Sequence, residues 1–193
     1  MTNEFLLEDR IQKTQQIINK YGEDNFVISY SGGLDSNVLD KLIDLALPNN
    51  RIPRVYSDTG IELNTVRDFV REKAKQDTRI EIITPKVPIK RMLEEEGYPF
   101  KSKEHSQYVS MYQSNSNLFS PDRRVLRVYV GIDVTKKGKL TFRPCPQKLR
   151  YQFKYGEGLT FKVSDKCCKR LKVEPFHIWQ RERETNRYHW ISA

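Results

Sequence analysis

The chain has 193 residues, a formal net charge of +9 and a mean hydropathy of -0.71. This length suits one domain, so we expect a single domain over residues 1–193. No apolar run approaches the ~20 residues of a membrane span, and the acidic start lacks the basic region of a signal peptide. These features argue against a membrane role and predict a cytoplasmic protein whose basic excess favours an anionic partner.

Helical and strand patterns alternate through the first half of the chain. Glycines at positions 22 and 97 are suited to end the first and last of these helices. The alternation at short spacing predicts an open, mainly parallel twisted sheet with helices on both faces, a Rossmann-like α/β fold. We expect helices over residues 5–21, 36–45, 64–76 and 87–96, and strands over 25–30, 52–56 and 79–83.

The pattern weakens after residue 100. We therefore expect a nucleotide-binding core over residues 1–100 and a less regular substrate-side segment over 101–193. Serine and aspartate at 164–165 are suited to cap a short helix. The expected elements are a helix over 104–113, a loop over 114–122, a β-prone stretch over 125–134, a turn at 136–139, a helix over 166–171, an extended stretch over 173–176 and a helix over 177–185.

The segment Ser-Gly-Gly-Leu-Asp-Ser at residues 31–36 follows a predicted strand and opens a predicted helix. Its two glycines allow a tight turn close to a ligand, and the helix presents unpaired N–H groups that favour an anion. Ser31 and Ser36 add hydroxyl donors, while Asp35 is suited to hold Mg²⁺ or to cap the helix. The alternative is an ordinary strand-to-helix turn. The segment is neither a Walker A loop nor a dinucleotide fingerprint.

Three segments in this order carry a resemblance to a known family. The 31–36 segment is similar to the PP-loop of the ATP pyrophosphatase superfamily. Residues 55–62, Val-Tyr-Ser-Asp-Thr-Gly-Ile-Glu, resemble the Asp-Thr-Gly segment of the phosphoadenosine phosphosulfate (PAPS) reductase family. Residues 165–176, which include Cys167 and Cys168, resemble the Cys-Cys and Lys-Val-x-Pro stretch of that family. Residues 97–104 also resemble short reductase-like proteins of phages and mobile elements.

The resemblance implies the roles of particular residues. Asp35 and Asp58 would be catalytic, and Asp35 would hold Mg²⁺. Glu62 is expected to cap the following helix. Arg143 and Lys148 are further candidates to contact sulfate or pyrophosphate. The expected ligand is an adenine nucleotide, namely ATP, adenosine phosphosulfate (APS) or PAPS. The residues expected to bind it are Ser29, Tyr30, Ser31, Gly32, Gly33, Leu34, Asp35, Ser36, Asp58, Thr59, Gly60, Lys101 and Lys103.

The cysteines argue against a self-contained iron–sulfur cluster. In related iron–sulfur proteins a Cys-Cys pair and a later Cys-x-x-Cys pair hold a [4Fe–4S] cluster, which takes four thiolates. Here Cys167 and Cys168 are accompanied only by Cys145. An ordinary pair of helix cysteines and a site completed by a partner remain alternatives. Related reductases also carry a nucleophilic cysteine in a tail, and this sequence ends at a predicted strand without one, which argues against sulfonucleotide reduction by these residues alone.

Three functional hypotheses follow from these patterns. The first is an enzyme acting at the phosphate or sulfate end of an adenine nucleotide. The second is a nucleotide-binding or regulatory module without chemistry. The third is a component of a nucleic-acid thiolation system, with a nucleic acid or a redox or sulfur-transfer protein as partner. A homodimer is also left open. His105, His177 and His189 are far apart, and we expect structural or surface roles for them rather than general-base catalysis.

Overall fold

The computed structural model describes residues 3–114, 120, 123–131, 144–153, 158–183 and 189–191. The chain forms two compact units, one from Met1–Lys86 with Leu171–Ala193, and the other from Val87–Arg170. The sequence-based boundary at residue 100 thus lies inside the second unit. The last part of the sequence-based 101–193 segment contributes to the first unit.

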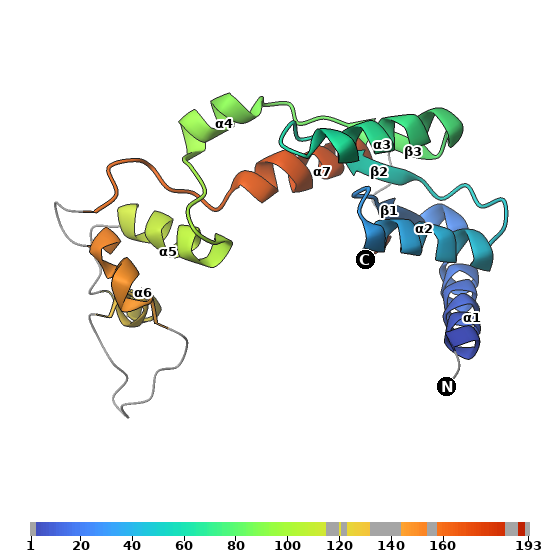
Figure 1. Ribbon diagram of the computed structural model, residues 1–193, viewed down its shortest axis with the longest axis horizontal. Helices are drawn as coiled ribbons and strands as arrows, with labels where there is room; N and C mark the ends of the chain where they lie inside the picture. The colour runs from blue at the N-terminus through green and yellow to red at the C-terminus, as the bar shows by residue number, and fades with distance from the viewer. Residues whose placement is uncertain are drawn as a thin grey trace. The chain divides into compact units, whose positions relative to one another are not determined.

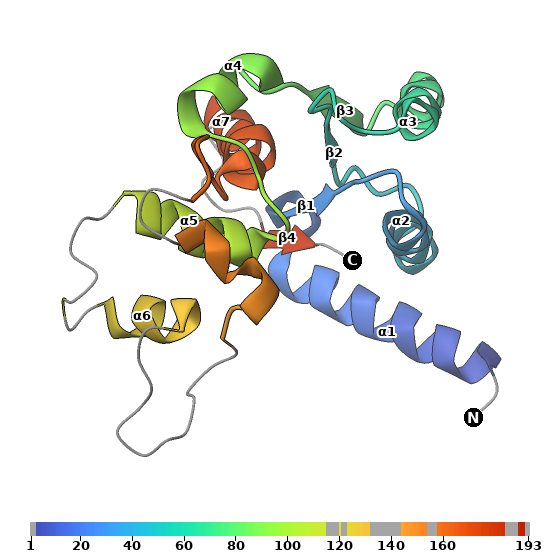
Figure 2. The same cartoon turned by 60° about the vertical axis from the view of Figure 1, so that its left-hand side comes forward.

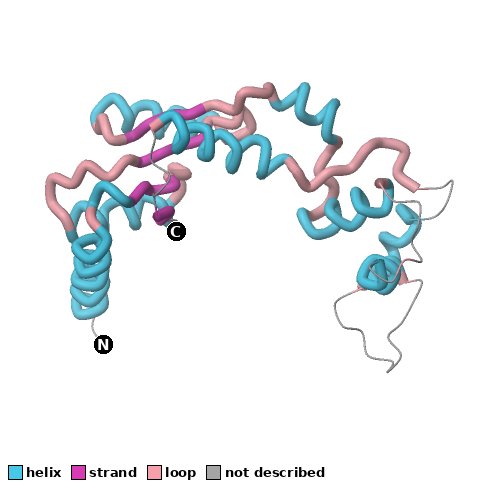
Figure 3. The backbone as a smooth tube through the Cα atoms, turned by 180° about the vertical axis from the view of Figure 1, so that it is seen from behind, coloured by secondary structure: helices cyan, strands magenta, loops and turns pink. Residues whose placement is uncertain are grey.

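The first unit is built on a four-stranded sheet in the order β3-β2-β1-β4 (Figures 1 and 3). Every neighbouring pair is parallel, and Ile28 of β1 stands opposite Arg54 of β2. This arrangement confirms the predicted open α/β sheet. The strands are β1 (Phe26–Ser29), β2 (Arg54–Ser57), β3 (Ile80–Ile83) and β4 (His189–Ile191).

Helices cover both faces of this sheet (Figure 2). Side chains alternate across a strand, so Phe26 and Ile28 pack with Ile43 on one face, while Val27 packs with Trp179 on the other. Figure 2 shows α2 and α3 on one side and α7 on the opposite side. The helices of this unit are α1 (Asn3–Tyr21), α2 (Leu34–Ala46), α3 (Asn64–Gln76) and α7 (Glu174–Glu182).

The second unit is mainly helical and has a core of its own. His105, which is buried, lies at its centre and contacts the Tyr129 hydroxyl through Nδ1 at 2.7 Å. Ser102 caps α5 by accepting a bond from the His105 N–H at 3.1 Å. Its elements are α4 (Ile89–Glu96), α5 (Lys103–Gln113), α6 (Arg124–Val130) and a 3₁₀ helix (Gln147–Phe153). Among the described helices, none has the length and apolar character needed to cross a bilayer.

The predicted β-prone stretch over residues 125–134 is wrong where the structure describes it. Residues 124–130 form α6, although valine and tyrosine favour strands. Leu126, Tyr129 and Val130 are spaced so that a helix turns all three into the core of the second unit. Gly131 then ends the helix in the left-handed conformation, with φ of 81°. The predicted turn at 136–139 lies outside the described residues, as does most of the loop at 114–122.

The predicted extended stretch over residues 173–176 is also wrong. Helical turns begin at Cys167, continue as a π-helix over Lys169–Val173 and run directly into α7. Pro175 is the second residue of α7, directly after the π-helical turn. Ser164 Oγ does accept a bond from the Lys166 N–H at 3.1 Å, as a capping residue would.

A buried arginine at the start of β2 joins the sheet to α2 and to the segment before the strand. Arg54 is fully buried, and its Nε donates to Asp40 Oδ1 at 2.8 Å. Its two Nη atoms donate to Asp44 at 2.8 Å, to Asn50 at 2.7 Å and to the carbonyl oxygen of Ile52. The charge is therefore satisfied by acceptors from α2 and from the segment that leads into β2, as a buried charge requires.

We expect Arg54→Met to lower the free energy of unfolding by about 3–5 kcal/mol, because it removes one of the two cations bonded to the buried Asp40 carboxylate. Urea denaturation followed by circular dichroism measures the loss. Arg51→Met, at an exposed position in the same segment, is the control and should change stability by less than about 0.5 kcal/mol. A stable Arg54→Met variant would show that the network does not stabilise the fold.

A second prediction concerns acid stability. The hydrogen bond from Arg79 lowers the pKa of Asp77 from 3.8 to about 2, against the opposing effect of burial. A carboxylate with a lowered pKa stabilises the fold above about pH 4, and this contribution of about 2 kcal/mol is lost as the pH falls towards 2. Asp77→Asn should therefore lose stability at pH 5 and about half as much at pH 3, measured by urea unfolding. Asp24→Asn, at an exposed turn position, should show no such difference.

Candidate nucleotide-binding site

The glycine-rich loop over residues 30–33 connects β1 to α2, as predicted. Gly32 has φ of 74°, in the region that favours glycine. A Cβ there would lie 2.6 Å from Val70 Cγ2 and 3.1 Å from Val66 Cγ1. Gly32 is therefore required both by its backbone conformation and by the close approach of α3.

Hydroxyl groups hold the loop in its own conformation. Ser31 Oγ accepts a bond from the Gly33 N–H at 3.3 Å and lies 3.1 Å from Ser36 Oγ. Ser36 Oγ donates to the Gly33 carbonyl at 3.0 Å. These bonds fold the loop back onto the first turn of α2. A direct bond from either hydroxyl to a phosphate stays a prediction.

The side-chain amide of Asn37 holds the loop in place. Its Nδ2 donates to the carbonyl oxygens of Gly32 at 3.2 Å and Gly33 at 2.9 Å. Its Oδ1 accepts from the Tyr30 hydroxyl at 2.5 Å and from Lys73 Nζ at 3.2 Å. Because the carbonyls are tied to Asn37, the loop offers N–H groups rather than carbonyl oxygens at the start of α2. The first N–H groups of a helix have no acceptor within it.

Lys73 links this loop to the buried arginine. Its Nζ contacts Asp40 Oδ2 at 2.6 Å and the Tyr30 hydroxyl at 3.0 Å. Burial would lower the pKa of Lys73, but the bonds to Asp40 and Tyr30 more than compensate and raise it. Lys73 therefore stays charged, and a continuous chain of bonds runs from Arg54 through Asp40 and Lys73 to the loop.

The second predicted loop follows β2, the strand next to β1. Asp58 is largely buried, accepts from Arg71 Nη2 at 2.9 Å and accepts from the Gly60 N–H at 3.3 Å. Parallel neighbours end at the same edge of a sheet, so residues 58–60 and 31–36 share the edge where α/β sheets bind ligands. The predicted placement of both segments at one edge is therefore confirmed.

The expectation that Glu62 caps the following helix is wrong. Its carboxylate accepts from the Thr59 N–H at 3.1 Å and from Thr59 Oγ1 at 2.7 Å. The N-cap residue of α3 is Leu63, which makes no side-chain bond to the helix. A carboxylate that reaches back three residues closes the 59–62 turn, and so fixes the backbone beside Gly60.

A buried tyrosine of β2 precedes this turn. Tyr56 is buried, and among the described residues its hydroxyl has no hydrogen-bond partner. Burial is the main cause that raises the pKa of Tyr56, and the negative charges of Glu62 and Asp58 add to it. Tyr56 is therefore neutral at physiological pH and contributes a dipole rather than a charge to this edge of the sheet.

The other predicted site residues are divided between the two units of the chain. Asp35 is exposed in the first turn of α2, and Leu34 is 80% exposed. Lys101, Lys103 and Lys148 belong to the second unit, and their part in nucleotide binding stays a prediction. Arg143 lies outside the described residues. Ser29 ends β1, where its backbone leads into the loop as expected.

The cysteines do not gather with other metal-binding side chains in the described parts of the chain. Cys145 is buried, Cys167 is half-buried and Cys168 is exposed. No three His, Cys, Asp or Glu side chains among the described residues are grouped so as to hold a metal ion. The whole sequence has three cysteines, and an iron–sulfur cluster usually takes four thiolates. A cluster here would therefore need a fourth ligand that is not a cysteine of this sequence.

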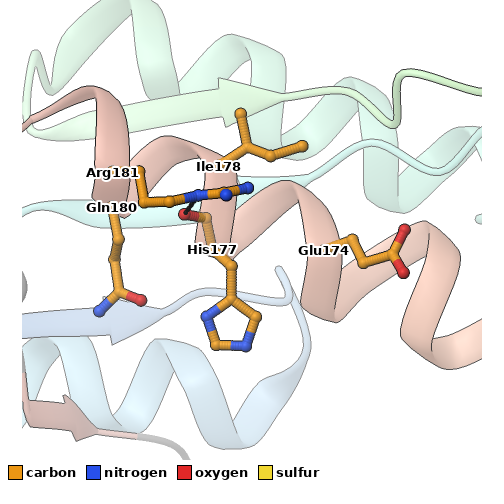
Figure 4. A pocket seen from close by; sticks show the side chains of 5 residues that line it. All are labelled: Glu174, His177, Ile178, Gln180 and Arg181. Atoms are coloured by element: carbon orange, nitrogen blue, oxygen red, sulfur yellow. Dashed lines mark hydrogen bonds between the residues drawn. The ribbon is translucent and has the colours of Figure 1, made fainter.

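A separate hollow of about 560 Å³ lies on α7 (Figure 4). Figure 4 shows the side chains of His177 and Gln180 pointing to the same side of the helix. Arg181 Nε donates to the carbonyl oxygen of His177 at 3.3 Å. Glu174 and Ile178 complete the described lining. His177 is exposed, as expected, and the mixture of charges in this hollow selects no particular ligand.

Sequence reasoning missed the residues that support the loop. Asn37, Lys73 and Arg71 do not belong to the recognised segments, and Lys73 and Arg71 lie more than thirty residues beyond the loop. One signal was available, since Arg54 interrupts a predicted apolar strand. A charged residue at such a position indicates a buried ion pair.

Comparison with known protein families finds a match to one family model. Residues 25–118 match the family model described as the phosphoadenosine phosphosulfate reductase domain. The matched segment contains β1, β2 and β3 together with both loops of the candidate site. A search of curated proteins finds no match to the chain.

The two glycines of the site give a matched test. Gly32→Ala should lower the free energy of unfolding by at least about 2 kcal/mol, because backbone strain and the contact with Val70 add together. Gly60→Ala should cost only about 1 kcal/mol, since its φ is 81° but no atom lies within 4 Å of the added Cβ. Thermal and urea unfolding measure both variants. Equal losses would contradict the close approach of α3 to the loop.

Proposed function

We propose that this chain, whose residues 25–118 match the phosphoadenosine phosphosulfate (PAPS) reductase domain, binds an adenine nucleotide at the glycine-rich loop. The ligand class is an adenosine 5′-phosphate whose α-phosphate carries an anhydride, either the pyrophosphate of ATP or the sulfate of APS or PAPS. The observation that carries this proposal is the pair of Asn37 bonds that hold the Gly32 and Gly33 carbonyls away from the start of α2.

Phosphate oxygens would be bound by the N–H groups at the start of α2. The loop backbone is exposed at Ser31 and Gly33, so an anion can approach it. The helix dipole adds partial positive charge at this end. Lys73 is bonded to Asp40 and Tyr30 and therefore acts on the loop from behind. Affinity for phosphate would thus come mainly from backbone groups that the buried network has already oriented.

The Asp58–Gly60 segment would bind the nucleoside part of the ligand. Its backbone is fixed twice, by the Asp58–Arg71 pair and by the bonds of Glu62 to Thr59. A rigid turn beside the phosphate loop gives a ligand a surface that needs little ordering on binding. Because the Asp58 carboxylate is already bonded to Arg71, we assign it to positioning this turn rather than to proton transfer.

Asp35 would hold Mg²⁺ together with the phosphates. Magnesium is commonly bound by one or two carboxylates, with substrate phosphates and waters as its other ligands. Asp35 fits this requirement because its side chain is exposed in the first turn of α2. When bound, the ion would neutralise charge on the phosphate oxygens.

The chemistry that this arrangement supports is displacement at the α-phosphorus. A nucleophile oxygen would bond to phosphorus as the bridging oxygen leaves with pyrophosphate from ATP or with sulfate from a sulfonucleotide. The N–H groups of α2 would stabilise the negative charge that develops on the phosphate oxygens. Positioning and charge stabilisation would provide most of the rate enhancement, and no Ser-His-Asp set is required.

Calorimetry of the full chain tests the proposal with ATP, APS, PAPS and, as a control, GTP, each with and without Mg²⁺. At least one adenine nucleotide should bind, at least about tenfold more tightly than GTP. Mg²⁺ should strengthen ATP binding to the wild type, and Asp35→Ala should abolish this increase. Asp24→Ala, at an exposed position outside the loop, should retain it.

Product analysis separates an enzyme from a binding module. Release of pyrophosphate or sulfate from a bound nucleotide supports displacement chemistry. Binding without turnover contradicts that step while retaining the nucleotide site. If none of ATP, APS and PAPS binds, the whole proposal fails.

A further inference from the structure

The net positive charge of the chain belongs to its second unit. Residues 87–170 contain 18 lysines and arginines against 8 aspartates and glutamates, which gives this range a formal net charge of +10. Since the whole chain carries +9, the residues of the first unit together carry -1. The charge of the second unit exceeds that of a single nucleotide, so it is suited to attract an anion with many charges.

Two aromatic side chains of the second unit lie in contact at its surface. The rings of Tyr98 and Phe161 meet edge to face, with their centroids 6.3 Å apart. Tyr98 is 46% exposed and Phe161 is 39% exposed. Phe100 packs against the core of the unit and contacts the Phe161 ring at 5.8 Å between centroids. We call Tyr98 and Phe161 the ring pair, and its contact with Phe100 joins it to the core.

The backbone that carries Tyr98 is fixed on both sides. Its N–H donates to the Lys162 carbonyl at 2.9 Å, and its carbonyl accepts from the Ser164 N–H at 3.0 Å. The two segments approach closely at Gly97, where a Cβ would lie 2.7 Å from the Lys162 carbonyl oxygen. The segments that carry the two rings are therefore paired directly through their backbones.

The backbone that carries Phe161 has a second support. The side-chain amide of Gln113 donates to the Phe161 carbonyl at 2.9 Å and accepts from the Val163 N–H at 2.9 Å. Gln113 is the last residue of α5, so this amide ties the segment to a helix of the same unit. The ring pair thus stands on an ordered base, and little further ordering is needed when a ligand binds to it.

Lysine side chains lie beside the ring pair. Lys101 has φ of 64°, a conformation that is uncommon for any residue other than glycine, and its Nζ lies 5.3 Å from the centroid of the Phe100 ring. Backbone strain of this kind is frequent at binding sites. Lys162 directly follows Phe161, and its Nζ donates to the Glu95 carbonyl. Both segments that carry the ring pair therefore also carry a cation next to an aromatic ring.

Carboxylates at the end of α4 are already paired with cations. Glu96 accepts from Lys166 Nζ at 2.8 Å and from Arg170 Nε at 3.0 Å. Glu95 accepts from Arg91 Nε at 2.6 Å. Paired carboxylates repel an approaching polyanion less than free carboxylates do, because the nearby cation offsets their charge.

Aromatic faces next to cations are suited to bind unpaired nucleotides. A base stacks on an aromatic ring, and the phosphates on either side of it are attracted by lysines. In a duplex the neighbouring base pairs cover each base face, so a ring on a protein surface stacks on a base only where the strand is unpaired. Peripheral proteins commonly contact a lipid surface through the broad apolar face of a helix. The ring pair instead lies on two short paired segments, which favours a nucleic acid.

We propose that the ring pair is a stacking platform for a single-stranded nucleic acid. Lys101 and Lys162 lie near the phosphates of the stacked nucleotides, and the net charge of the second unit attracts the strand as a whole. The contact is independent of base sequence, because every base has a face that stacks. This role goes beyond the proposed nucleotide binding at the glycine-rich loop and does not rest on it.

Fluorescence anisotropy of the full chain, without nucleotide, tests the proposal. The probes are a labelled DNA strand and a labelled RNA strand, each of about 20 nucleotides, and a DNA duplex of the same sequence. At least one single strand should bind at least about tenfold more tightly than the duplex, and its affinity should fall as the salt concentration is raised. The DNA and RNA probes identify the kind of strand. Binding to neither strand, or equally tight binding to the duplex, overturns the proposal.

Substitution of the ring pair separates stacking from charge attraction. The double variant Tyr98→Leu/Phe161→Leu keeps apolar side chains and removes both aromatic faces, so it should raise the dissociation constant at least about tenfold. Tyr98→Trp/Phe161→Tyr keeps both faces and should bind as the wild type does. Lys101 stays unchanged in these variants because it is also a predicted nucleotide-binding residue. A leucine variant that binds as tightly as the wild type contradicts the stacking role.

Phe69→Leu is the matched control, since Phe69 is an aromatic residue that is 46% exposed on α3 of the first unit. It should leave the affinity for single strands unchanged, and circular dichroism shows whether each variant keeps its helices. Co-sedimentation with vesicles of phosphatidylcholine and phosphatidylserine tests a lipid surface as the partner. Vesicle binding that the leucine variant weakens, without binding to either single strand, assigns the ring pair to lipid and overturns the proposal.

Discussion

The buried guanidinium of Arg54 is the constraint around which the first unit is organised. An arginine without solvent contact needs acceptors on every side, and here they come from α2 and from the turn that precedes β2. Asp40 then accepts from Lys73 of α3 as well, so one carboxylate joins two helices and a strand. Arg79, ahead of β3, bonds to Asp44 and extends the network to the edge of the sheet.

The same network fixes the backbone conformation of the glycine-rich loop. Lys73 and Tyr30 hold Asn37, and Asn37 holds the carbonyls of Gly32 and Gly33. The two loop carbonyls are therefore held by Asn37 without any ligand. An ordered loop would bind the proposed nucleotide phosphates with little further loss of conformational entropy.

The features that depend on local residue spacing were predicted from the sequence. The features that depend on contacts between distant residues were not. Strong periodicity predicted α3 at its observed bounds, and the paired glycines predicted the loop. The preference of valine and tyrosine for strands was misleading in α6, because the core of the second unit selects a helix there. Glu62 was assigned to the wrong end of its turn because capping and turn closure use the same residue type. The bonds of Lys73 to Asp40 and Asn37 join residues 33 and 36 apart, and no local pattern predicts them.

Helix α2 shows how several demands act on one short segment. Its first turn carries N–H groups that have no acceptor within the helix, one stripe of side chains packs into the core, and Asp40 bonds to Arg54 and Lys73. Val38, Leu42 and Leu45 follow the adjacent face, where α1 packs beside α2, so one short helix serves the loop, the core and a neighbouring helix at once.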